Sequence, residues 1–379
     1  MDFSWDKELD NYYQRIVQQV QIHVPAENAD KEAYWTRSQW RDCGELGLLG
    51  LSVPKQYGGQ GLGALATAHM LEAFGYGCLD MGLVFSAAAH LFACCMPIVE
   101  QGSSSLRERI LPGLCSGELV GANAITEAEA GSDVFAMKTT ARRDGEEYIL
   151  NGTKSYVSNG PIADMFVVYA VTNARHGYFG MSGFVLERNT PGLSLSEPFQ
   201  KMGLSTTPAC QVTLQDCHVK AEKMLGEEGQ GALIFTQSML WERACLFAGY
   251  VGMMQRQLEV CVKYAQERHQ FGKALGKNQA ISHRLADMKL RLEAARLLLY
   301  QACWLFEKGE KAQEAIALSK LAISEAAISS SLDAIQIHGS IGFGREYGIE
   351  RMLRDAIPSR IFSGTSEMQR DIIASELGL

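Results

Sequence analysis

Positive charge is scarce in this sequence. Lys and Arg number 35 against 43 Asp and Glu, which gives a net charge of −8, and the basic residues form no run. Surfaces that bind nucleic acid or anionic membranes are basic, so neither partner is expected. The N-terminus lacks a basic segment followed by an apolar stretch, so no secretory signal peptide is expected either.

Several chemical motifs are missing as well. The ten cysteines include no Cys-x-x-Cys pair, and no two of the eight histidines stand four residues apart, so no metal site is predicted. Neither a Gly-x-Ser-x-Gly nucleophile elbow nor a dinucleotide fingerprint on a strand is present. An enzyme of this sequence would therefore use carboxylates for acid–base chemistry and bind its cofactor outside a Rossmann unit. Several cysteines lie in apolar runs, which is typical of reduced, buried thiols in a cytoplasmic protein.

Length and periodicity predict the domain organisation. The 379 residues, 47% hydrophobic and 21% charged, are typical of a globular protein of two or three domains. Helical periodicity dominates residues 1–118 and 228–379, whereas short β-branched and aromatic runs separated by turn signals fill residues 119–227. The predicted fold class is α+β and multidomain, with an N-terminal helical domain, a middle β domain and a C-terminal domain like a four-helix bundle.

Three local patterns can be placed on elements. Residues 35–49 are predicted to form a helix that Gly50 ends. Residues 166–172 are predicted to form a buried strand, because the run is continuously apolar. Asn151-Gly152 is predicted to be the turn of a β-hairpin, since this dipeptide is a strong hairpin signal.

One carboxylate, that of Glu242, lies in a largely apolar segment of the sequence. Residues 229–255 contain no proline and are predicted to form one long helix, whose only charged residues are Glu242 and Arg243. Burial on such a helix would raise the pKa of the Glu242 carboxyl, as a general base working near neutral pH requires. The alternative is a structural ion pair with a cation from another helix. On a helix, the neighbours of Glu242 three and four residues away are all uncharged: Ser238, Met239, Cys245 and Leu246.

Four stretches are candidates for holding a cofactor. Residues 124–133 open the β region and are dense in hydroxyl-bearing and small side chains, and residues 156–160 follow the predicted hairpin turn. Residues 267–273 lie between two helices, with Arg268 placed to meet a phosphate bidentately. Residues 361–369 precede the last helix, whose N-terminus could bind an anion. Each stretch alone is also consistent with an ordinary hydroxyl-rich helix cap.

Together and in this order, the stretches resemble the acyl-CoA dehydrogenase flavoproteins. That family carries Thr-Glu-Pro-Gly-Ala-Gly-Ser-Asp, Gly-x-Lys-x-x-Ile-Thr-Asn, Arg-x-x-Phe-Gly, Gln-x-x-Gly-Gly and Glu-Gly-Thr-Ser-Glu motifs. The chain has counterparts of all five, spread over its length at 126–133, 152–159, 268–272, 336–340 and 363–367. The resemblance implies N-terminal helices, a middle β-barrel-like domain, a C-terminal four-helix bundle and FAD as the cofactor.

The resemblance also implies cofactor contacts, position by position. Ile125, Thr126 and Ser132 would contact the flavin ring and its pyrophosphate, and Tyr156, Val157 and Ser158 would flank the ring. A neighbouring subunit would complete the diphosphate and adenine end, so a homotetramer or a dimer is implied. The residues implied at that end are Arg268, Gln270, Phe271, Gln279, Gln336, Gly339 and Ser340, and those implied at the adenosine and pyrophosphate are Thr365, Ser366 and Glu367.

One departure from the family pattern bears on catalysis. The usual base is the glutamate of Glu-Gly-Thr-Ser, and Ser363 stands at that position here. A minority branch, including the isovaleryl and long-chain enzymes, takes the base from the bundle helix, one position before an arginine. That position here is Glu242, followed by Arg243. The resemblance therefore implies Glu242 as the catalytic base and Arg243, Ser363 and Gly364 as residues at the substrate.

At finer grain, residues 47–54, 57–64, 80–85 and 241–248 look like flavoenzymes that oxidise a prolyl group tethered to a peptidyl carrier protein, found in antibiotic and toxin pathways. This implies FAD-dependent α,β-dehydrogenation of an L-prolyl thioester to pyrroline or pyrrole. The implied partner is a peptidyl or acyl carrier protein bearing phosphopantetheine-linked proline, with an electron-transfer flavoprotein or oxygen as acceptor. Alternatives are a short or branched-chain acyl-CoA dehydrogenase, a flavin-dependent monooxygenase on this scaffold and, in another class, a non-catalytic helical interaction protein.

Overall fold

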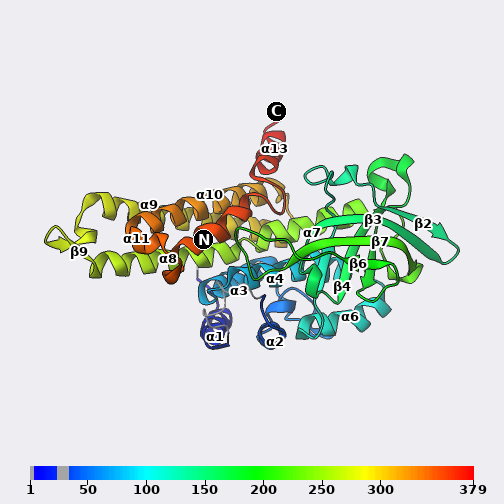
Figure 1. Ribbon diagram of the computed structural model, residues 1–379, viewed down its shortest axis with the longest axis horizontal. Coiled ribbons are helices and arrows are strands. Elements are labelled where there is room, and N and C mark those ends of the chain that lie inside the picture. Colours follow the sequence, from blue (N-terminus) through cyan, green and yellow to red (C-terminus); the bar gives the residue numbers. More distant parts are fainter. Residues whose placement is uncertain (1–3, 24–33) are drawn as a thin grey trace.

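The computed structural model describes residues 4–23 and 34–379. N-terminal helices, a β region and a C-terminal group of long helices follow one another along the chain, as Figure 1 shows, and the predicted α+β class is confirmed. The β region lies at the right-hand end of the view and the long helices extend to the left. The N-terminal helical elements are α1 (Lys7–His23), α2 (Arg37–Glu45), α3 (Ala64–Gly77), α4 (Met81–His90), the π-helical segment η4 (Leu91–Cys95), α5 (Met96–Gln101) and α6 (Ser104–Ser116).

The first predicted helix boundary is wrong. Helix α2 ends at Glu45, and a short 3-10 turn follows at Leu48–Gly50. Gly47 causes the early end, because its φ of 78° lies in the left-handed region that ends helices. Gly50 therefore lies inside a second, separate turn.

One mixed sheet forms the β region, with the strand order β6-β7-β3-β2-β4-β5-β8 and β1 paired in parallel with β4. The predicted buried strand is β4, and its side chains are buried from Met165 to Ala170. The strands are β1 (Gly121–Ala124), β2 (Thr140–Asp144), β3 (Glu147–Ser158), β4 (Met165–Val171), β5 (Met181–Glu187), β6 (Leu193–Leu195), β7 (Ala209–Lys220) and β8 (Met224–Leu225).

Asn151-Gly152 is not a turn. Both residues lie inside β3, where the pairing with β7 shifts register between Leu150 and Gly152. A side chain at Gly152 would collide with Thr139, so the glycine permits close packing at a bulge. The β2–β3 hairpin instead turns at Gly145, whose φ is 62°. The dipeptide signal was misleading because a bulge and a turn demand the same backbone freedom.

The C-terminal part is built from long helices. The single helix predicted over 229–255 is two helices, because the chain tightens at Leu246 and Phe247, whose carbonyls accept hydrogen bonds from the amides three residues ahead. This break lets the first helix pack on η4 and the second pack on α3. The helices are α7 (Gly231–Cys245), α8 (Ala248–Glu267), α9 (Gln279–Glu307), α10 (Gln313–His338), α11 (Ser340–Phe343), α12 (Ile349–Ala356) and α13 (Ser366–Glu376).

Helices α3 and α8 cross at backbone contact. A Cβ added at Gly75 would overlap the Gly249 carbonyl oxygen, which belongs to a helix backbone and cannot rotate away. We expect Gly75→Ala to lower the free energy of unfolding by about 1–3 kcal/mol, because overpacking exceeds the helix-propensity gain of about 1 kcal/mol. Thermal or denaturant unfolding measures this. Gly344→Ala is the control, since its added Cβ would have ordinary 3.7 Å neighbours; equal stability of the two variants would contradict the expectation.

Two apolar helical stretches in the described residues are long enough to cross a membrane by length and composition. They are Met81–Gln101 and Gln313–His338, and in the 18-residue windows that meet this criterion 89% and 56% of the residues, respectively, are buried inside the protein. Burial within the fold accounts for their apolar composition, as in the core helices of many proteins.

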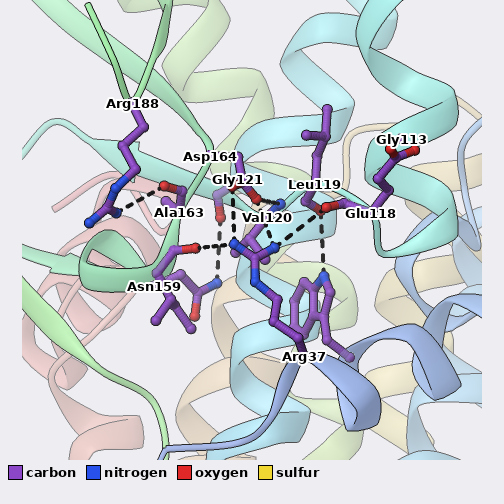
Figure 2. Close-up of polar contacts among 12 residues, drawn as sticks. Arg37, Gly113, Glu118, Leu119, Val120, Gly121, Asn159, Ala163, Asp164 and Arg188 are labelled. Atoms are coloured by element: carbon purple, nitrogen blue, oxygen red, sulfur yellow. Dashed lines mark hydrogen bonds and ion pairs between the residues drawn. The ribbon is translucent and has the colours of Figure 1, made fainter.

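Side-chain contacts join the β region to the N-terminal helices (Figure 2). Arg37 donates hydrogen bonds to both carboxylate oxygens of Asp164, at 2.8 and 3.0 Å, and to the Ile162 carbonyl at 2.9 Å. Asn159 donates to the carbonyls of Ser86, at 3.1 Å, and Gly121, at 3.4 Å. Because Asn159 directly follows β3, these contacts hold the end of that strand against α4 and β1.

Candidate active site

A buried carboxylate on α7 contacts the loop before α13. Glu242 is 7% exposed, and the Ser363 hydroxyl donates a short hydrogen bond to its Oε1. Arg243 Nε donates to the Ser363 carbonyl at 2.7 Å. Gly364 adjoins Arg243, and its φ of 85° is in the left-handed region. The structure thus brings Glu242, Arg243, Ser363 and Gly364 together, although the loop lies some 121 residues away in sequence.

Burial dominates the electrostatics of this cluster. It raises the pKa of Glu242 above its usual value, while the Ser363 hydrogen bond and the Arg243 charge oppose the rise. The expected rise is therefore present. No salt bridge reaches Glu242 from the residues that the structure describes, so the alternative of a structural ion pair with a cation from another helix finds no partner there. A buried carboxylate paired only with a hydroxyl is suited to accept a proton.

A second cluster braces the loop that follows β1. The Lys154 amine, 0% exposed, donates to the Ile125 carbonyl at 3.0 Å and to Glu127 at 2.8 Å. Ser155 N donates to the Thr126 carbonyl at 2.8 Å. Three successive residues, 125–127, are thereby held against β3 from behind.

Glu127 is the acceptor that closes this brace. It also accepts hydrogen bonds from the amides of Lys138 and Thr139 and from the Thr139 hydroxyl, at 2.5–2.9 Å. Burial would raise the pKa of Glu127, but the hydrogen bonds outweigh it and lower that pKa to about 2. Burial lowers the pKa of Lys154 to about 8 despite the Glu127 charge. The sequence analysis does not single out either residue, because a charged side chain ordinarily faces water, whether in a strand, as Lys154 is, or in a loop, as Glu127 is.

The other predicted contacts on β3 differ in what they can offer a ligand. Tyr156 is 67% exposed with a φ of 57°, and its ring lies 5.1 Å from that of Phe199. The Ser158 side chain is half-buried. Val157 is buried in the interior of the β region, so only its backbone can face a ligand. Ser132 is exposed on the loop, beside Gly131, whose missing Cβ would have no atom within 4 Å.

The predicted cofactor contacts at the start of α13 make hydrogen bonds or ion pairs with other residues of the same chain. The Thr365 hydroxyl caps the helix by accepting from Met368 N at 3.3 Å, and Ser366 donates to Glu325 at 3.2 Å. Glu367 is exposed and lies 3.7 Å from Arg370. All three adjoin the Ser363–Gly364 loop directly.

Seven of the residues predicted to contact FAD lie far from β3. The β9–β10 hairpin (His269–Gln270 and Lys273–Ala274) is at the opposite end of the molecule from β3 (Figure 1). Phe271 at its tip is 95% exposed, with a φ of 52°. The end of α10 joins this region, because the His338 ring stacks on Tyr264 of α8 at 4.3 Å. One chain therefore does not bring this set to the β3 set; all seven are exposed: Arg268, Gln270, Phe271, Gln279, Gln336, Gly339 and Ser340.

Comparisons with known proteins cover all three regions of the chain. Family models described as the N-terminal, middle and C-terminal domains of acyl-CoA dehydrogenase match residues 7–118, 122–217 and 229–378. An L-prolyl-[peptidyl-carrier protein] dehydrogenase of Pseudomonas fluorescens is 54% identical over 381 residues, covering 100% of both chains. One from a Serratia species is 48% identical, covering 90% of this chain and 88% of its own.

A solved structure described as PigA with FAD and proline superposes with a TM-score of 0.98 at 43% identity, with 100% of both chains covered. The prolyl acyl carrier protein oxidase AnaB superposes with a TM-score of 0.96 at 43% identity, covering 99% of this chain and 100% of that one. Similarity of this extent over all three regions excludes the alternative of a non-catalytic helical interaction protein.

Proposed function

This chain belongs to the acyl-CoA dehydrogenase family, and we propose that it oxidises an L-prolyl thioester carried on a peptidyl or acyl carrier protein. It is an FAD-dependent oxidoreductase acting on a CH–CH bond. The observation that carries the proposal is the buried Glu242 held by Ser363, where the family's usual base is absent. The products are a pyrroline after one two-electron oxidation and a pyrrole after two.

The described residues fit FAD. The braced loop 125–127 and the exposed Tyr156 ring offer backbone groups and an aromatic surface for a flavin, and the open space beside Gly131 leaves room for phosphates at Ser132. When bound, FAD supplies the two-electron acceptor that takes the hydride from the substrate's β carbon. We propose that Ile125, Thr126, Ser132, Tyr156, Val157 and Ser158 hold the flavin end, and that Thr365, Ser366 and Glu367 hold the adenosine and pyrophosphate.

Glu242 would act as the general base. Its carboxylate takes the proton from the α carbon, whose acidity the thioester carbonyl raises, as the β C–H bond breaks and the Cα=Cβ bond forms. The hydroxyl of Ser363 orients the accepting oxygen, and Arg243 holds Ser363 through its carbonyl. Ser363 and Gly364 would border the bound thioester.

Anaerobic flavin bleaching tests the proposal. We expect prolyl-loaded carrier protein to bleach the flavin of the purified protein, while a panel of straight and branched acyl-CoA thioesters does not. Carrier protein loaded with alanine is the control for nonspecific reduction, since it has no ring to oxidise. Bleaching by an acyl-CoA alone would instead establish a short or branched-chain acyl-CoA dehydrogenase.

Turnover should depend on pH through Glu242. The base acts deprotonated, and burial raises its pKa, so the rate of flavin reduction should fall as pH drops through a value above that of an ordinary glutamate. Ser363→Ala removes a hydrogen bond that lowers this pKa, so the acid limb should move to higher pH. Stopped-flow measurement of the flavin reduction rate across pH gives the acid limb of the wild-type protein and that of the variant. An unchanged or downward-shifted limb in the variant would contradict the role of Ser363.

We further propose that a second copy completes each cofactor site. The separation of the hairpin set from β3 and the unburied Phe271 and Arg268 support this. A homotetramer or a dimer would supply Arg268, Gln270, Phe271, Gln279, Gln336, Gly339 and Ser340 to the neighbouring chain's FAD. Light scattering measures the mass of the assembly. Reoxidation of the reduced flavin by oxygen or by an electron-transfer flavoprotein identifies the electron acceptor.

The ten buried free cysteines support a reducing, cytoplasmic location.

A further inference from the structure

Asn123 lies on the face of β1 that meets the helices. Its neighbours Ala122 and Ala124 point into the interior of the β region, with their partners Phe166 and Val168 on β4. Asn123 pairs with Val167, which packs in the helical core instead. Since side chains alternate along a strand and paired residues share a face, the Asn123 side chain points toward the helices.

The helix-facing side of β1 is connected to the helix of Glu242 through η4. A Cβ added at Gly121, two residues before Asn123, would lie 2.9 Å from Cys94 Cβ, so the face packs directly on η4. The η4 segment in turn packs on α7, the helix that carries Glu242, and the rings of Phe92 and Trp241 stack there with centroids 6.3 Å apart. Two residues after Asn123, on the same face, comes Ile125, a proposed flavin contact. Asn123 therefore shares its face of β1 with a proposed flavin contact and faces the helical layer in which η4 packs on the helix of Glu242.

Three side-chain oxygens in this layer are buried without a hydrogen-bond partner among the described residues: Asn123 Oδ1, the Tyr169 hydroxyl and the Ser238 hydroxyl. Ser238 is one helical turn before Glu242, and Tyr169 follows Val167 on the same face of β4. Hydroxyls donate and accept, so Tyr169 and Ser238 can satisfy one another, whereas Asn123 Oδ1 can only accept. Asn123 is half-buried and the other two residues are at most 2% exposed, so only the Asn123 side chain is partly open. Its Oδ1 is buried as placed, and a turn of the amide about the broad χ2 torsion of asparagine would present that oxygen on the open side.

We propose that Asn123 Oδ1 accepts a hydrogen bond from the N–H of the substrate's pyrrolidine ring and so selects a prolyl thioester over a simple acyl thioester. This rests on the proposed function. The ring nitrogen is bonded to the α carbon from which Glu242 takes the proton, so its N–H must lie beside the base. A simple acyl chain presents only C–H groups there and would leave the buried oxygen unpaired. Sites that bind a substrate N–H can reject analogues lacking it by about 10⁴-fold or more.

The test compares two thioesters on the same carrier protein: prolyl, and cyclopentanecarbonyl, which has the ring but no N–H. The wild-type protein should reduce its flavin far faster with the prolyl form. Asn123→Leu should lower kcat/KM for the prolyl form at least about 100-fold and leave the cyclopentanecarbonyl rate unchanged or raised. Asn189→Leu, at an exposed turn, should change neither.

Each other outcome is decisive. Equal losses on both thioesters, or an unchanged prolyl rate, would overturn the role of Asn123 while leaving the proposed function intact. Failure of the wild-type protein to respond to the prolyl form would instead defeat the proposed function. If Asn123→Leu does not retain FAD, Asn123→Asp carries the test: it keeps an acceptor, so it should preserve discrimination, and loss of discrimination with FAD bound would refute the inference.

Discussion

Glu242→Gln abolishes flavin reduction by substrate and leaves FAD bound: this is the largest effect we expect. The amide is isosteric and still accepts the Ser363 hydrogen bond, but it cannot take a proton from the α carbon. Loss of a general base costs about 10²–10⁴-fold in rate, and no second carboxylate contacts Ser363 in the described residues to replace it. Anaerobic stopped-flow with prolyl-loaded carrier protein measures the rate.

Two controls isolate the proton-transfer step. Chemical reduction with dithionite should bleach Glu242→Gln at the wild-type extent, because that route needs no base. Glu100→Gln neutralises another partly buried carboxylate with a raised pKa, one that accepts a hydrogen bond from Trp241 at 2.8 Å, and should keep much of the activity. Turnover retained by Glu242→Gln would defeat the assignment of the base.

Lys154→Met should give the largest loss of stability and release FAD. Removing one member of a buried ion pair leaves the other charged and unpaired, which typically costs about 3–5 kcal/mol. The loss would also free the Ile125 carbonyl from its anchor, so the loop that we assign to the flavin would loosen. Denaturant unfolding of the apoprotein measures the first effect and titration with FAD the second.

The double variant Glu127→Gln/Lys154→Met separates charge from packing. It leaves no unpaired charge, so it should recover part of the stability lost by Lys154→Met. Lys289→Met breaks the exposed pair with Glu293 on α9 and should cost less than about 1 kcal/mol. A Lys154→Met protein as stable as Lys289→Met, with unchanged FAD affinity, would show that the brace is not needed.

The sequence by itself determined the class of the protein and was enough to nominate Glu242 as the base that we propose. Periodicities of 3.6 and 2 residues are local, so the succession of helical, β and helical regions was readable without a structure. The motifs were also local, and Ser363 at the position of a missing glutamate pointed to Glu242. Patterns of this kind survive because each depends on a few neighbouring residues.

Only the tertiary structure decided how distant residues meet. Three findings depend on contacts between residues 27 to 121 positions apart in the sequence: Ser363 donates to Glu242, Lys154 is buried against Glu127, and the face of β1 that carries Asn123 packs on η4. Packing also overrode two local signals: the predicted helix over 229–255 breaks to fit two different neighbours, and Asn151-Gly152 serves a bulge. Burial and pairing arise when surfaces come together, and no single stretch of sequence contains that information.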